Sequence, residues 1–302
     1  MTDQVVDSVG GRQAPSPAQP APVGWRTPRP ARVLLGWLPP EQGEFLLANH
    51  AGARPAEALR ARIREALSAV AARPAGLDQT AAVSALPPEL TDHAAQVGMT
   101  LAGASMQAEG WDIAMVDLDR IVAFQPNVFT DTTADRVAGL DPGDLRSIAA
   151  LTLPISDTAP VAVHYDGLSR VYTITSPNPN LKVVGNFDDR PADGPPGFGF
   201  RVAVTTSFLQ VARFRGRLVL RDGYHRSYGL LGRGIARVPA YVRDFDTTEG
   251  LAPGGMLPHG TWFGDRPPLL RDYHDDRVAE SVPLAAPNRV IVIPALETLV
   301  MN

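Results

Sequence analysis

The chain has 302 residues, of which 44% are apolar and 20% charged, so it is long enough to bury one large core or two modest ones. Its 28 basic and 32 acidic side chains give a net charge of −4, which excludes a global positive field for nucleic acid or an anionic membrane and leaves only local binding of that kind. The absence of cysteine excludes disulfides, thiolate metal sites and cysteine nucleophiles.

Two regions precede the part of the chain that carries recognisable chemistry. Residues 1–32 are dense in proline, which disfavours helix and sheet, and we expect a disordered tail. Residues 33–108 predict a helical lead-in, because apolar side chains recur at helical spacing between Pro55 and Pro74 and again from Leu90 to Leu101. No apolar window approaches the roughly 18 residues of a membrane span, and no secretory leader is evident, so we expect a cytoplasmic protein without membrane contact.

From residue 109 to residue 245 short β-type runs predict a small mixed sheet with interspersed helices, hence an α+β fold. The expected strands are 113–122, a hairpin of 161–165 and 171–175, then 200–206, 209–213, 218–220 and 238–242, with a helix after Asp141-Pro142. The segment 176–198 is rich in proline, glycine and aspartate and predicts an exposed loop insertion. Residues 246–302 form a C-terminal extension that ends in a predicted strand over 289–294.

The most informative segment predicts a strand, a sharp turn at Asp222-Gly223, a short helix over 224–233 that ends at Gly234, and a returning strand. A glycine before a helix lets a ligand approach the backbone, and the unpaired amides and dipole of the helix favour an anion there. We expect the amides from Tyr224 to Ser227 to surround the anion and Arg226 to add a bidentate positive charge. The alternative is a purely structural turn between strand and helix that binds no ligand.

These residues resemble the ParB/sulfiredoxin-like family, whose members carry Asp-Gly-x-x-Arg or Gly-x-x-Arg between a strand and a helix, followed by Gly-Ile and a Val-Pro strand. The matching residues here are Asp222, Gly223, Tyr224, His225, Arg226, Gly234, Ile235, Val238 and Pro239. The family's opening strand has a counterpart in Met115 to Pro126, so the resemblance covers about 111–245. It implies a bacterial protein with the ParB N-terminal-like fold.

The resemblance implies binding of a nucleoside triphosphate or diphosphate, with or without Mg²⁺, and possible phosphoryl transfer or hydrolysis. Two differences from the family pattern narrow the activities that the resemblance implies. Tyr224 stands where sulfiredoxin needs a cysteine and where ParB partition proteins have a glutamate, and the 246–302 extension has too little helical pattern for a helix-turn-helix domain. The alternatives are a non-catalytic module that binds a protein partner and a ParB-like DNA-binding or nuclease protein. The net charge and the missing reader helix count against nucleic acid.

Other polar side chains have both a functional and a structural interpretation. His225 is a candidate phosphate donor or general acid/base, or it packs against the turn. Asp222 is a candidate for orienting Arg226 or a metal, or it simply forms the turn. Asp117 and Asp119 alternate on an expected strand, so their side chains would share one face. Such a pair of carboxylates could bind Mg²⁺ or act as a general base, or it could simply be a solvated strand edge.

An aspartate- and histidine-rich cluster lies in the C-terminal extension. Its members are His259, Asp265, Asp272, His274, Asp275 and Asp276. Such residue types bind cations, but the spacing matches no established ligand pattern, so a solvated loop is the preferred interpretation and no metal site is assigned.

Overall fold

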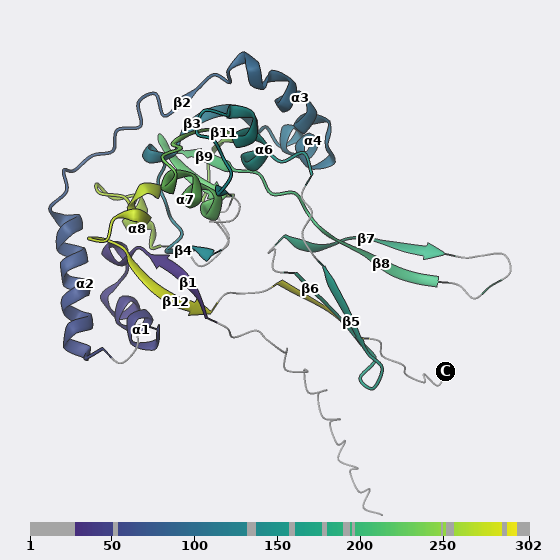
Figure 1. Ribbon diagram of the computed structural model, residues 1–302, viewed down its shortest axis with the longest axis horizontal. Coiled ribbons are helices and arrows are strands. Elements are labelled where there is room, and N and C mark those ends of the chain that lie inside the picture. Colours follow the sequence, from purple (N-terminus) through teal and green to yellow (C-terminus); the bar gives the residue numbers. More distant parts are fainter. Residues whose placement is uncertain are drawn as a thin grey trace, which may run out of the picture.

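A five-stranded mixed sheet carries the strand, turn and helix singled out by the sequence in this computed structural model (Figure 1). The strand order is β10-β9-β11-β3-β2. The strands are β2 (Val83–Ser84), β3 (Asp112–Asp117), β9 (Gln210–Phe214), β10 (Arg217–Asp222) and β11 (Arg237–Phe245). β11 runs parallel to β9 and antiparallel to β3, and α7 (Tyr224–Gly232) connects β10 to β11. The predicted α+β class is confirmed.

The structure describes residues 28–50, 54–131, 137–156, 161–176, 180–189, 194, 197–248, 250–251, 257–285 and 289–294. Residues 238–242 of β11 are all buried, as expected for a middle strand with both faces covered. One covering element is α6 (Leu145–Thr152), which packs on β11 and is capped by Asp144. Within these residues no helix is both long and apolar enough to cross a membrane.

A second sheet brings together three segments that are far apart in the sequence. Its order is β12-β1-β4, formed by Glu280–Ala285, Pro28–Val33 and Asn127–Phe129. Pro28–Val33 therefore differs from the disordered tail predicted through residue 32; residues 1–27 of that tail lie outside the described residues. The strand forms despite its prolines because Ala31 and Val33 are buried, while Arg29 bonds Asp131 at 2.6 Å.

Two β-ribbons extend away from the rest of the molecule (Figure 1). One has the order β13-β6-β5, with β5 (Ala162–Asp166), β6 (Val171–Ser176) and β13 (Arg289–Pro294). The other pairs β7 (Leu181–Asp189) with β8 (Gly197–Val204). The loop predicted over 176–198 is thus largely a hairpin arm, because residues 181–189 find antiparallel partners in β8.

The helices agree with the sequence pattern in most places. α2 (Ala56–Ala71) begins after Pro55 as predicted. The helix expected across 90–101 is divided into α3 (Thr91–Met99) and α4 (Leu101–Ala108), because Thr100 is extended and its hydroxyl accepts from the Gly103 amide at 3.0 Å. Other helical elements among the described residues are η1 (Leu35–Trp37), α1 (Pro40–His50), η2 (Pro88–Leu90), η3 (Leu118–Arg120), α8 (His259–Trp262) and η4 (Leu270–His274).

Candidate functional site

The turn between β10 and α7 has the backbone conformation that its sequence predicts. Gly223 is the N-cap of α7 and has a φ of 101°, in the left-handed region that favours glycine. A Cβ at this position would lie 3.0 Å from the Leu209 Cγ and 3.2 Å from its Cα. The first turn of α7 contains no acidic residue and the N-cap supplies no side-chain hydrogen bond. Gly223 is therefore required both by its conformation and by the close approach of Leu209.

A hydrogen-bonded network beneath the turn connects Arg226 to Asp222. Arg226 is only 8% exposed. Its guanidinium donates to the Ser207 carbonyl at 2.7 Å, to the Ser207 hydroxyl at 2.8 Å and to the Leu151 carbonyl at 3.3 Å. The Ser207 hydroxyl donates to the Asp222 carboxylate at 3.0 Å, and that carboxylate accepts from the Gly223 amide at 2.6 Å. These bonds of Arg226 point into the protein and fix the geometry of the turn.

Tyr224 has a structural position. Its hydroxyl donates to the Leu220 carbonyl at 2.7 Å and accepts from the Phe124 amide at 3.1 Å, and its ring packs edge-on against Phe124. Burial raises the pKa of this phenol, which keeps it protonated. Only the backbone of Tyr224 therefore remains as a candidate ligand group.

His225 and Ser227 complete the set of predicted site residues. The His225 ring is partly exposed and lies parallel to the Phe129 ring of β4, with centroids 5.9 Å apart. Ser227 is fully buried, and its hydroxyl has no hydrogen-bond partner among the described residues. The structure thus brings Asp222, Gly223, His225 and Arg226 together at one turn, with Asp222 and His225 its partly exposed members.

Asp117 and Asp119 do not share a strand face. β3 ends at Asp117, whose carboxylate accepts from the Asp119 amide at 3.2 Å and so starts the short helix η3. The same carboxylate pairs with Arg120 at 3.2 Å. The predicted strand over 113–122 is therefore shorter than expected, because an aspartate caps the next turn instead of continuing the ladder.

The C-terminal aspartates are held by arginines. Asp272 is 3% exposed, rather than part of a solvated loop, and accepts from Arg73 at 2.9 Å and from the Leu269 amide at 2.7 Å. Asp275 accepts from Arg73 and Arg277, and its hydrogen bonds from Arg277 lower its pKa. Groups of three or more side chains that could hold a metal are absent from the described part of the chain. These carboxylates form a structural ion-pair network.

His274 of the same cluster packs against α7. Its ring is stacked on Tyr228 with centroids 4.2 Å apart, and its Nε2 lies 3.0 Å from the Tyr228 carbonyl oxygen. Burial lowers the pKa of this imidazole. The histidine therefore joins η4 to α7 through its stacked ring.

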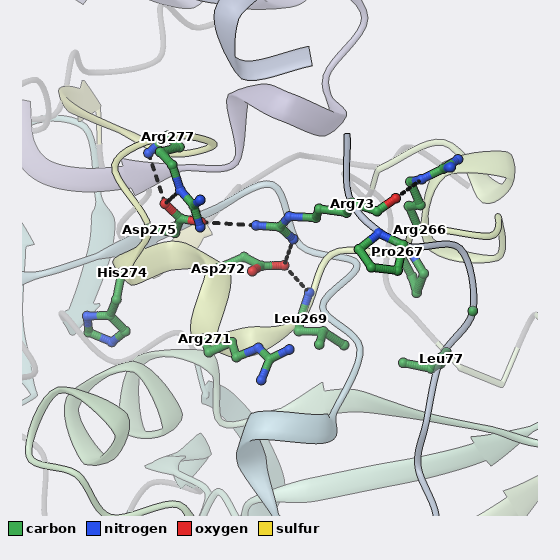
Figure 2. Close-up of a pocket in the computed structure, with 12 residues that line it drawn as sticks. Arg73, Leu77, Arg266, Pro267, Leu269, Arg271, Asp272, His274, Asp275 and Arg277 are labelled. Carbon is green, nitrogen blue, oxygen red and sulfur yellow. Dashed lines mark hydrogen bonds and ion pairs between the residues drawn. The ribbon is translucent and has the colours of Figure 1, made fainter. Parts of the chain in front are cut away.

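The sequence did not predict two arginine-lined grooves. The first has a volume of about 610 Å³, and Figure 2 shows Arg73 between Asp272 and Asp275 within it. The second has a volume of about 540 Å³. The charged side chains of the first groove are Arg73, Arg266, Arg271, Arg277, Asp272 and Asp275, and those of the second are Arg213, Arg215 and Arg217. The only sequence signal was the close spacing of arginines in 213–217 and in 266–277.

Comparison of the chain with protein-family models, with curated proteins and with solved structures finds no match. Its function therefore has to be inferred from its own geometry and chemistry.

Proposed function

We propose that the chain binds the phosphates of a nucleoside di- or triphosphate at the amino end of α7. The observation that carries this proposal is the left-handed Gly223 that opens α7 without a side-chain cap and without an acidic residue in the first turn. The first amides of a helix have no acceptor within the helix, and the dipole favours an anion beside them. The resemblance of Asp222 to Arg226 to the ParB/sulfiredoxin-like motif supports the same ligand class.

In this proposal the site residues have separate tasks. The backbone amides of Tyr224, His225 and Arg226 receive the phosphate oxygens, because the Gly223 amide already donates to Asp222. The partly exposed His225 also contacts the ligand directly. Arg226 is a positioning residue, because its bonds to Ser207 and Leu151 hold the turn in place while its charge stays beneath the helix start. Asp222 fixes the same turn through Ser207 and the Gly223 amide.

The test is thermal unfolding of the full chain with ATP, ADP and CTP, each with and without Mg²⁺. A ligand of the native state at about 100 times its Kd stabilises the protein by about 2.7 kcal/mol, so we expect a raised Tm with at least one nucleotide. His225→Ala should reduce that rise by more than half without lowering the Tm of the free protein by more than a few degrees. Release of phosphate in the same samples reports any turnover.

The matched control is His164→Ala, which makes the same change at an exposed position on β5. It should keep the full nucleotide effect. Equal effects in His225→Ala and the wild type would contradict the assigned site, and an unchanged melting curve with every nucleotide would contradict the function itself.

The second candidate function, binding of a protein partner, is favoured by the β7-β8 ribbon. Phe198 and Phe200 are 67% and 42% exposed there, and Phe187 on β7 is 43% exposed. A two-stranded ribbon is marginally stable alone, and exposed apolar patches often mark interaction surfaces. A melting curve that no nucleotide changes would make this the leading function.

A further inference from the structure

The two arginine-lined grooves are neighbours on the surface. Leu77, in the segment after α2, lines both of them. A hydrogen bond also connects the two grooves. The Arg217 guanidinium in the second groove donates to the Gly264 carbonyl at 2.8 Å, and Gly264 is two residues before Arg266 of the first groove. The grooves therefore form one extended surface, here called the arginine surface.

The arginine surface is positive although the whole chain has a net charge of −4. Four arginines and two aspartates line the first groove, and three arginines without an acidic partner in the lining are in the second. Clustered positive charge raises the local concentration of anions even on an acidic protein.

Much of this charge is left uncompensated. Arg73 and Arg277 are paired with aspartates, and Arg213 is paired with Asp244 at 3.0 Å. Arg266, in contrast, donates to a backbone carbonyl, which orients its guanidinium without cancelling its charge. Arg217 likewise donates to backbone carbonyls, although Asp265 is near enough to act on it electrostatically.

Arg215 and Arg271 are the most available members of the surface. Both side chains are exposed, and neither has a hydrogen-bond acceptor among the residues that the structure describes. Arg215 lies over the Phe214 ring at 5.1 Å, in the turn between β9 and β10. Figure 2 shows Arg271 in the first groove, apart from the hydrogen-bonded network of Arg73. One free guanidinium thus faces each groove.

We propose that the arginine surface binds the phosphate backbone of a nucleic acid. Two adjacent positive grooves match a ligand with repeated negative charges better than a single small anion, and guanidinium groups bind phosphate oxygens in a bidentate manner. The residues that line the grooves include no Trp, Tyr or Phe side chain on which bases could stack. Binding is therefore expected to depend on phosphates and not on base sequence.

The experiment measures fluorescence anisotropy of a short labelled DNA duplex and of a labelled single strand with the full chain at several salt concentrations. The test variant is Arg215→Gln with Arg271→Gln, and the control is Arg146→Gln at an exposed position of α6 outside both grooves. We expect the double variant to weaken binding at low salt by about tenfold or more and to make the slope of log K against log salt shallower by about two, one for each lost phosphate contact.

Several results would overturn the proposal. They are absence of binding by the wild type, equal affinity of the double variant, equal loss in Arg146→Gln, and preference for a labelled polyglutamate peptide over both nucleic acids. The last result would reassign the surface to an acidic protein partner.

This proposal and the proposed nucleotide site fail independently. The double variant should keep the rise in Tm with nucleotide, and His225→Ala should keep nucleic-acid affinity. A loss of both activities in both variants would contradict the assignment of two separate sites.

Discussion

In the first turn of α7 the guanidinium of Arg226 is buried and donates to Ser207 and Leu151, whereas in the arginine surface Arg215 and Arg271 are exposed and face the grooves. The first arrangement satisfies polar groups that would otherwise be buried without partners. The second leaves positive charge available for a ligand. The comparison shows that an arginine within a recognisable motif can have a structural role inside the protein. The accessible positive charge comes instead from arginines outside any motif.

The largest expected effect tests the internal task of Arg226. Arg226→Ala removes the hydrogen bonds of a buried guanidinium to two part-buried carbonyls, so we expect the free energy of unfolding to fall by about 3 kcal/mol. Arg271→Ala, in the exposed part of the comparison, should change it by less than about 0.5 kcal/mol. Urea unfolding measures both, and similar values for the two variants would remove the distinction.

A smaller effect is expected from the glycine that opens α7. Gly223→Ala places a Cβ at a φ of 101° and 3.0 Å from the Leu209 Cγ, which should cost about 2 kcal/mol. Gly234→Ala has a φ of 74° but open space around its Cβ, so it should cost about 1 kcal/mol. Urea unfolding of both variants compares them directly, and an equal cost would show that the approach of Leu209 does not constrain the turn.

The smallest effect concerns His274, which joins the first groove to α7. Because burial lowers its pKa in the folded state, the unfolded chain binds a proton first as the pH falls. Stability should therefore be full above the ordinary histidine pKa of about 6.5 and should decrease as the pH falls from there to the folded-state pKa. The lowered pKa of Asp275 adds a loss only below about pH 4.

The measurement is Tm between about pH 7.5 and pH 5.5 for the wild type and for His274→Phe, which keeps a ring beside Tyr228. The variant should show a flatter profile. A profile as steep as that of the wild type would assign the pH dependence to other histidines.

Local patterns predicted the parts of the fold that depend on neighbouring residues. The turn at Gly223, the helix that ends before Gly234 and the hairpin of β5 and β6 are all where the sequence places them, because glycine conformation, helical period and strand alternation are local signals. The same holds for the strand over 289–294. The assignment of a nucleotide to α7 remains a prediction.

Long-range pairing explains what the sequence did not predict. Pro28–Val33 forms a strand by pairing with Glu280–Ala285 on one side and with Asn127–Phe129 on the other. The first groove likewise combines Arg73 with the distant residues Arg266, Arg271 and Arg277. The burial of Arg226 was equally hidden, since its acceptors, Leu151 and Ser207, are distant in sequence. The periodicity of a single segment carries no information about contacts between residues that are distant in the sequence.

The same two acceptors lie at the base of the β-ribbons. The chain leaves the five-stranded sheet region after Thr152 and returns to it before Leu209. The two segments are joined at this base, because the Leu209 amide donates to the Thr152 carbonyl at 2.8 Å. Leu153 and Phe208 are buried together just beyond it. We therefore expect insertions and deletions between them to leave the register of the five-stranded sheet unchanged, as long as β6 keeps its pairing with β13. Arg226 donates to Leu151 on one side of this base and to Ser207 on the other, so the start of the ribbons is attached directly to the first turn of α7.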